Sequence, residues 1–140
     1  MGKVQILAVL TMDGCLSSEL YDKAHQDLCL DRCGLDEIRK KAFYRVTPDY
    51  SISMLHEWRK DCTNIRYLAE ATPDTADYIN GLLRMHAVDE IILYTVPFIS
   101  GSGRHFFKSA LPEQHWTLSS LKSYPNGVCR IIYILDIKAR

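Results

Sequence analysis

Three short segments carry the side chains best suited to chemistry, and each follows a predicted strand. They are residues 11–17, 70–74 and 101–104. In the first, Asp13 offers a carboxylate that can bond the polar edge of a substrate or help deliver a proton. In the third, Gly101-Ser102-Gly103 frees backbone amides for an anion, and Arg104 adds positive charge. Ligands of open α/β sheets bind outside the carboxyl ends of parallel strands, so the segments are predicted to converge on one crevice.

Three predicted strands lead into these segments. Residues 4–10 are nearly all apolar, which is typical of a strand covered on both faces, and residues 90–98 precede the glycines. Residues 64–70 form a third strand. The helix expected after Thr72-Pro73 has its covered positions at Ala76, Ile79, Leu82, Leu83 and His86. This strand-helix-strand unit implies two parallel strands joined by a right-handed crossover.

The remaining elements are two helical regions and a pair of strands. Ser17 or Ser18 is expected to cap a helix that ends at Gly34, and residues 35–46 predict a helix running into a short strand. Thr47-Pro48 is expected to begin a helix whose covered face holds Ile52, Leu55, Trp58 and Arg59. Residues 115–118 and 128–135 predict an antiparallel pair at the end of the sheet.

These elements predict one domain over residues 1–140, an α/β fold with a mixed, mostly parallel sheet, flanking helices and a C-terminal antiparallel hairpin. The 17 basic and 17 acidic residues balance, so no basic field exists to attract nucleic acid. Because no apolar run approaches the roughly 20 residues that cross a bilayer, we expect a soluble protein without a membrane partner. Reduced thiols are the simplest interpretation of the cysteines, so we expect it to be cytoplasmic.

The five cysteines predict reduced thiols rather than a metal centre. They include no Cys-x-x-Cys pair. Cys29 and Cys33 are four residues apart and could face one side of a helix, but no further ligands stand at workable positions. We therefore expect no metal site.

The order of the motifs resembles the dihydrofolate-reductase-like fold, most closely the reductase domain of riboflavin biosynthesis, the RibD C-terminal domain family. Thr11-Met12-Asp13-Gly14 is similar to the family's Ser-Leu-Asp-Gly, and Val88-Asp89-Glu90 and Pro97 precede a Gly-x-Gly loop. The resemblance implies an NADPH-dependent reductase of a pteridine-like or pyrimidine ribosyl substrate, often homodimeric.

The same resemblance assigns roles to individual residues. Asp13 would be the catalytic acid, and Thr11, Gly14 and Glu70 would contact the small-molecule substrate. The cofactor would lie against the glycine loop, Gly101, Ser102, Gly103 and Arg104.

Two departures from the family pattern affect the cofactor site. Where the family's strand ends in Glu-Gly-Gly, this chain has Glu70-Ala71-Thr72, and side chains there should obstruct the approach of a phosphate. A Gly-Arg-x-Thr loop is expected between residues 34 and 48, where we find only Arg39-Lys40-Lys41 and Arg45. The alternative is therefore a catalytically lapsed ligand-binding or dimeric interaction module of the same fold, with degenerate cofactor loops.

Each motif also has a purely structural explanation. Asp13-Gly14 is a common turn pair, a lone Gly-x-Gly makes a tight turn, and residues 39–41 fit a solvated face. Asp89 and Glu90 are adjacent at the amino end of a strand and point apart, so we interpret them as structural. The five histidines lie outside any recognisable hydrolase motif, and only His105, after the glycine loop, merits mutation.

Overall fold

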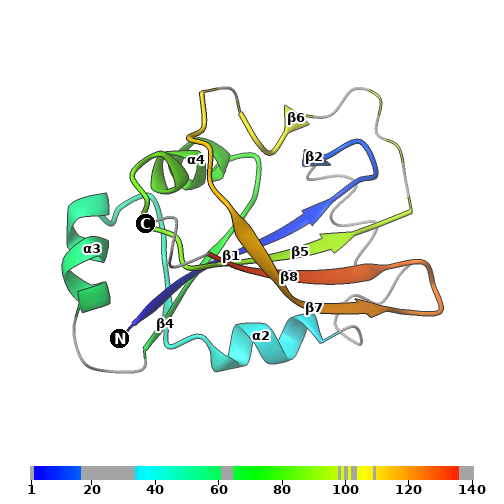
Figure 1. Ribbon diagram of the computed structural model, residues 1–140, viewed down its shortest axis with the longest axis horizontal. Helices are drawn as coiled ribbons and strands as arrows, with labels where there is room; N and C mark the ends of the chain where they lie inside the picture. Colours follow the sequence, from blue (N-terminus) through cyan, green and yellow to red (C-terminus); the bar gives the residue numbers. More distant parts are fainter. Residues whose placement is uncertain are drawn as a thin grey trace.

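Six strands form the central sheet of the computed structural model (Figure 1). They are β1 (Lys3–Leu10), β3 (Tyr44–Arg45), β4 (Arg66–Glu70), β5 (Glu90–Thr95), β7 (Trp116–Ser123) and β8 (Cys129–Leu135). Their order in space is β3-β4-β1-β5-β8-β7. The structure describes residues 2–16, 34–60, 65–97, 99, 101, 104–108 and 110–135.

The sheet is parallel around β1 and antiparallel at its C-terminal edge. β1 pairs in parallel with β4 on one side and with β5 on the other, and β3 pairs in parallel with β4. Helix α4 (Ala76–Arg84) joins β4 to β5, so the predicted parallel unit is confirmed. The antiparallel pairing of β8 with β5 and of β7 with β8 confirms the predicted hairpin.

The two faces of the sheet bury separate cores. The even-numbered residues from Val4 to Leu10 pack with α4 and with α3 (Ile52–Lys60), whereas Leu7 and Val9 pack with Leu35 of α2 (Leu35–Lys41). In Figure 1, α4 lies above the central strands and α2 below them. Burial of both faces explains why β1 is nearly continuously apolar, since each buried aliphatic side chain contributes about 1.5–3 kcal/mol.

The predicted starts of two helices were wrong. Helix α3 begins at Ile52, because the Ser51 hydroxyl accepts the N–H of Met54 at 3.1 Å and so caps the helix. Thr47 belongs to a turn instead, in which its backbone carbonyl accepts the N–H of Tyr50. Helix α4 begins at Ala76, four residues beyond Thr72.

The end of α4 also differs from the prediction. His86 lies beyond the helix, is exposed and has a positive φ of 54°, so it is not part of the covered face. The predicted covered positions Ala76, Ile79, Leu82 and Leu83 are buried, as expected.

Other predictions are confirmed or lie outside the described residues. Residues 35–46 form α2 and then β3, as predicted. The helix expected after Ser17 or Ser18 lies outside the described residues. Gly34, where that helix was expected to end, has a left-handed φ of 83° and directly precedes α2. Cys129 is a free thiol, and the cysteines at positions 29, 33 and 62 lie outside the described residues.

The described residues contain neither a membrane-spanning helix nor a metal-binding cluster. No helix there is long and apolar enough to cross a membrane. No group of three or more His, Cys, Asp or Glu side chains in this part of the chain is arranged to hold a metal ion.

Candidate functional site

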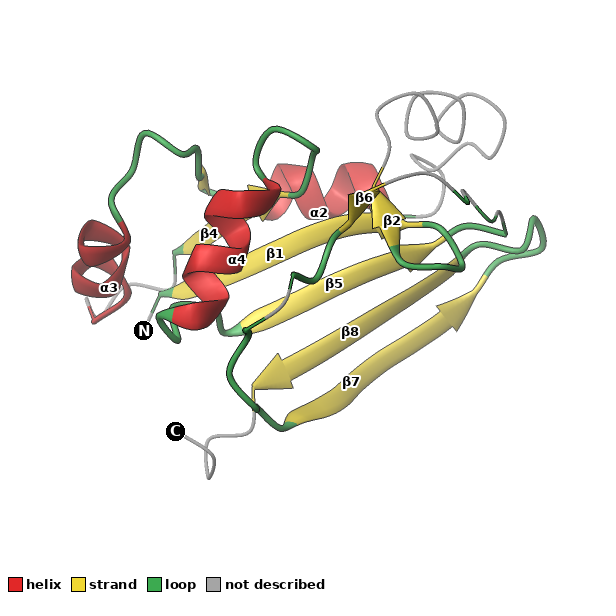
Figure 2. Cartoon of the chain, turned by 90° about the horizontal axis from the view of Figure 1, so that it is seen from above, coloured by secondary structure: helices red, strands yellow, loops and turns green. Residues whose placement is uncertain are grey.

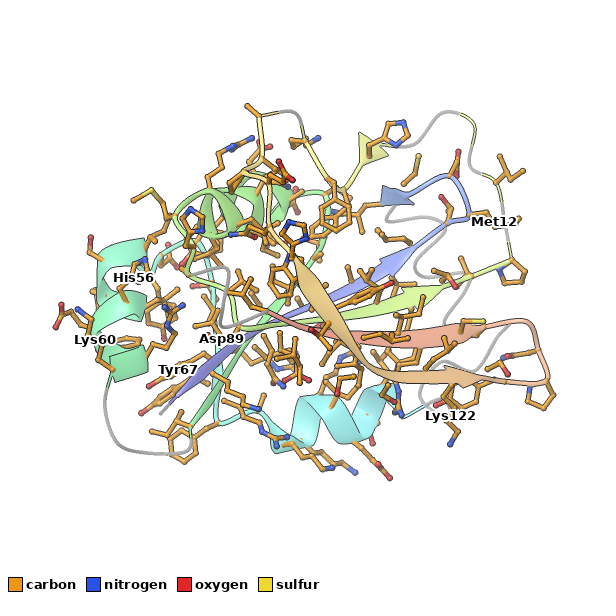
Figure 3. The ribbon with its side chains drawn as sticks, viewed as in Figure 1. Met12, His56, Lys60, Tyr67, Asp89 and Lys122 are labelled. Carbon is orange, nitrogen blue, oxygen red and sulfur yellow. The ribbon has the colours of Figure 1, made fainter. Side chains whose placement is uncertain are left out.

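The segment after β1 is a tight turn held by the Thr11 side chain. The Gly14 N–H donates to the Thr11 carbonyl at 3.0 Å, and Gly14 adopts a φ of 77°. The buried Thr11 hydroxyl donates to the Asp13 carboxylate and accepts the Cys15 N–H at 3.0 Å. Met12, labelled in Figure 3, is 68% exposed at the tip of this turn. Asp13 and Gly14 therefore do make a turn, and its geometry fixes the direction of the carboxylate.

Asp13 also connects this turn to the glycine loop. The N–H of Gly101 donates to the Asp13 carboxylate oxygen Oδ2 at 3.0 Å. The two loops meet because β1 and β5 are neighbours, with Leu10 level with Thr95 at their carboxyl ends. Two of the three predicted segments are thus brought together, as the topology required.

A second, two-stranded sheet closes the same region. Strand β2 (Cys15–Leu16) pairs antiparallel with β6 (Arg104–His105), and the Phe106 N–H donates to the Gly14 carbonyl at 3.1 Å. Leu16 and the fully buried Phe106 belong to the core that contains α4, and Figure 2 shows both strands on the α4 side of the main sheet. The loops after β1 and β5 are therefore joined twice, by a side chain and by backbone pairing.

A buried asparagine anchors the segment after the glycine loop. Asn80 of α4 is 0% exposed, and its Nδ2 donates to the Phe106 carbonyl at 2.7 Å. Its carbonyl oxygen accepts the Lys108 N–H at 3.0 Å. Since both ends of the amide are used, Asn80 fixes residues 106–108 to the helix.

A cysteine and a histidine meet at this closure, a pair that sequence reasoning missed. The Sγ atom of Cys15 lies 3.9 Å from Nδ1 of His105, in directly paired residues of β2 and β6. Cys15 is buried and His105 is exposed. The sequence offered a positional signal, because Cys15 lies within one predicted site loop and His105 directly follows another.

Glu70 ends β4 but does not join the Asp13 cluster. The strand register places Glu70 level with Leu7, four residues before Thr11, which is about 13 Å along the sheet. Its carboxylate pairs with Arg39 of α2 and, at 3.4 Å, with Arg45 of β3. Glu70 therefore lies in a separate ion-pair cluster at the carboxyl end of β4.

The basic residues of the middle segment divide into paired and exposed groups. Arg39 is largely buried against Glu70, so the solvated-face interpretation was wrong for this residue. Arg45 is 56% exposed at the end of β3, and Thr47 two residues later is also exposed. Arg45-Val46-Thr47 has the Arg-x-Thr spacing of the family's loop, with Tyr44 in the place of glycine. That spacing is visible in the sequence and could have pointed to Arg45 and Thr47.

Two backbone donors of the loop before α4 are satisfied within the loop itself. The Thr72 N–H donates to the Thr75 hydroxyl at 2.8 Å, and the Thr75 N–H donates to the Thr72 hydroxyl at 3.2 Å. The Ala71 N–H donates to the Leu7 carbonyl at 2.7 Å, and the Ala71 methyl is buried in the core. The side chain in position to block a phosphate is therefore Thr72 rather than Ala71.

Part of the predicted cofactor loop falls outside the described residues. Ser102 and Gly103 are not described, and Arg104 is described only as a backbone paired with Leu16. Gly101 is exposed, has a φ of 73°, and has no atom within 4 Å of the position a Cβ would take.

Asp89 and Glu90 are structural, as interpreted. The Asp89 carboxylate accepts the Val4 N–H at 3.0 Å and lies 3.7 Å from Arg59, and Glu90 accepts an N–H of the Gln5 amide at 3.1 Å. Both contacts lie at the amino ends of the strands, away from Asp13.

The fold matches that of solved riboflavin-biosynthesis proteins. No family model and no curated protein matches the chain. Among solved structures, a candidate riboflavin biosynthesis protein from Shewanella sp. PV-4 superposes with a TM-score of 0.62 at 11% identity, over 96% of this chain and 99% of that one. The chain has the fold of this riboflavin-biosynthesis protein.

RibD of Acinetobacter baumannii has the same fold. Its TM-score is 0.60 at 12% identity, over 97% of this chain and 58% of RibD, so the present chain spans little more than half of that protein. A second form of the same RibD gives a TM-score of 0.54. These superpositions establish the fold that the motif order predicted, and at such low identities they establish the fold alone.

Proposed function

We propose that this protein is an NADPH-dependent reductase of a pteridine-like or pyrimidine ribosyl substrate, bound between the loops that follow β1 and β5. The observation that carries the proposal is the hydrogen bond between Asp13 and Gly101, which brings a carboxylate and a glycine loop together at the carboxyl ends of two parallel strands. The riboflavin-reductase-like fold supports the same location.

Some of the residues present fit a dinucleotide. The backbone at Gly101 is open to close approach, and the exposed Arg45 can pair with a phosphate oxyanion, with the Thr47 hydroxyl beside it in sequence. NADPH, when bound, supplies the hydride. The chain's own residues would then hold the substrate's polar edge at Thr11 and Asp13 and exclude water through the β2–β6 closure.

The protein's contribution to proton delivery would come from the same two loops. The Asp13 carboxylate accepts hydrogen bonds from Thr11 and Gly101 through different oxygens, so it acts first as a clamp that orients both loops. The exposed His105 imidazole, adjacent to Cys15, is a second group there that can carry a proton to the substrate.

We propose a homodimer that uses the uncovered outer strands of the sheet. A bulge in β7 shifts the register between Leu118 and Ser120, so Leu118 and Leu121 both face the side that carries Tyr133 and Ile131 of β8. Leu118 is 52% and Leu121 63% exposed, and Figure 2 shows no described helix over these strands. An exposed apolar edge strand of this kind is suited to pairing with a second copy.

The second candidate function is a lapsed enzyme that keeps the fold as a ligand-binding or dimeric module. The observation favouring it is the loop before α4, where Thr72 and Thr75 satisfy each other's backbone N–H groups. The donors that a cofactor phosphate would use in this loop are therefore already occupied.

Titration with NADPH and with NADH, followed by thermal unfolding, separates the two candidates. A ligand at 100 times its Kd stabilises by about 2.7 kcal/mol, which raises Tm on the order of 10 °C for a domain of this size. An NADPH-dependent rise supports the reductase and justifies a substrate screen. No rise with either nucleotide would leave the lapsed module as the better account.

A further inference from the structure

A polar groove of about 200 Å³ lies between α2 and the sheet, on the face opposite α4. Its charged lining comes from four elements that are distant in sequence: α2, β4, β5 and β8. The residues that line it are Gln5, Gly34, Glu37, Ile38, Lys41, Arg66, Glu90, Arg130 and Ile132.

The cations of this groove have no protein partner in the described part of the chain. Lys41, Arg66 and Arg130 form no ion pair and no side-chain hydrogen bond there. The Nε atom of Arg130 is buried as well as unpartnered. The other two basic residues of α2, Arg39 and Lys40, are paired with Glu70 and Asp36, although the Nε atom of Arg39 is likewise buried without a partner. Because the Nε atom of Arg130 is closed to solvent, a ligand in the groove would pair with the terminal nitrogens of its guanidinium.

Packing rather than hydrogen bonding holds the Arg130 guanidinium in place. Gly34 lies so close that a Cβ there would stand 3.0 Å from Nη1 of Arg130, and 3.6 and 3.7 Å from the hydroxyls of Tyr124 and Tyr94. Gly34 has a φ of 83°, which a side chain would also disfavour. The guanidinium edge is therefore preorganised in a partly buried setting, which suits a planar or tetrahedral oxyanion.

The acidic side chains of the groove do not cancel this charge. Glu90 accepts a hydrogen bond from Gln5 at 3.1 Å, which fixes its carboxylate, and Glu37 is exposed on α2. Three cations and two carboxylates leave a net positive lining. The groove is also smaller than the roughly 300 Å³ at which drug-sized sites begin, so its volume fits a small metabolite.

We propose that this groove binds a small organic anion, whose carboxylate or phosphate group pairs with Arg130 and whose remainder lies toward Lys41 and Arg66. This site is independent of the proposed reductase function, because it lies on the α2 face, whereas the Asp13 loop is joined to β6 on the other.

The test is calorimetric titration of the folded protein with sodium succinate and, separately, with inorganic phosphate, at constant ionic strength. We expect saturable binding of at least one probe, and the probe that binds identifies the oxyanion as carboxylate or phosphate. Arg130→Gln should raise Kd by roughly tenfold or more. Arg130→Lys should raise it by less, since a lysine keeps the charge but lacks the two parallel N–H donors of the guanidinium.

The matched control is Lys60→Gln, which removes one positive charge from α3 on the opposite face, at a side chain that is 73% exposed (Figure 3). It should leave Kd unchanged. If Arg130→Gln does not fold, Arg66→Gln, at an exposed position, should weaken Kd severalfold. Absence of saturable binding to the native chain, or equal binding by the Arg130 or Arg66 variant, would overturn the proposal. Asp13→Asn should not alter this binding, which separates it from the reductase site.

Discussion

The carboxylate of Asp13 accepts the backbone N–H of Gly101 at 3.0 Å, across 88 residues of sequence. The same carboxylate accepts the hydroxyl of Thr11, which holds the turn after β1. One side chain thus sets the relative position of the two loops that should enclose a substrate. Any role of Asp13 in catalysis has to be separated from this structural role.

Asp13→Asn should reduce both turnover and stability. An amide keeps the size of the side chain but weakens two charge-assisted hydrogen bonds, so the free energy of unfolding should fall by about 1–2 kcal/mol in urea. Met12→Ala, at the neighbouring exposed position, should change it by less than about 0.5 kcal/mol. If the Asn variant loses turnover with its stability intact, the clamp contributes little and direct contact with the substrate is favoured.

Thr72→Gly and Ala71→Gly should have opposite effects. Thr72→Gly removes the side chain in position to block a phosphate, although the Thr75 N–H still donates to the Thr72 carbonyl at 3.1 Å, so the change should create or strengthen NADPH binding. Ala71→Gly removes a buried methyl and should lower stability by about 1 kcal/mol without altering NADPH affinity. Fluorescence titration of both variants against the native chain measures the difference. Equal affinities in all three would mean that this loop does not contact the cofactor.

Asn80→Ala should loosen the segment that closes the site. It leaves the buried Phe106 carbonyl without its donor and the Lys108 N–H without its acceptor, at a cost of about 1–3 kcal/mol. Amide exchange at residues 106 and 108 should accelerate more than exchange in β1. Asp77→Asn, at an exposed position of the same helix, is the control. Uniform acceleration throughout the chain would instead indicate global destabilisation.

Stability should fall at alkaline pH through Tyr78. Burial raises the pKa of this phenol above its ordinary value of 10.0, and its hydroxyl donates to the Tyr50 carbonyl at 2.7 Å. Because the folded state holds this proton more tightly, its contribution is complete below about pH 10 and is lost as pH rises through the raised pKa. Tyr78→Phe should remove this alkaline component in urea unfolding at pH 8 to 11. An unchanged pH profile would exclude Tyr78 as its source.

Leu121→Lys should dissociate the proposed homodimer. The charge would fall in the middle of the apolar strip that Leu118 and Leu121 form on β7, where a second copy would bury it. Sedimentation velocity should show a monomer for this variant and a dimer for the native chain. Lys122→Ala, one position along the same strand, is the control and should remain dimeric. A native chain that sediments as a monomer would remove the basis for this interface.

The sheet could be predicted from the sequence because its signals are local. The apolar run of residues identifies β1 by its length. The spacing of apolar residues identifies β4, α4 and β5 in the same way. The starts of α3 and α4 could not be fixed in this way, because Thr-Pro pairs indicate both turns and helix starts. At α3 the choice depends on which hydroxyl reaches a free N–H, and Ser51 does so.

The candidate site was predicted only in part, because its contacts depend on topology. Asp13 and Gly101 come together once β1 and β5 are known to be neighbours, which the motif order implied. The meeting of Cys15 with His105 requires the small β2–β6 sheet, whose strands of two residues are too short to leave a pattern. The pairing of Glu70 with Arg39 requires the packing of α2 on the sheet.

The central place of β1 has a consequence for biosynthesis. This strand leaves the ribosome first among the strands of the sheet, yet Gln5 pairs with Glu90, which is made 85 residues later. At translation rates of about 5–20 residues per second, the apolar segment waits roughly 4 to 17 s for that partner. Strand β4, which pairs with the other edge, is made before Glu90, so both edges are open at first and one edge stays open for the whole interval. A nascent strand of this kind is what chaperones shield.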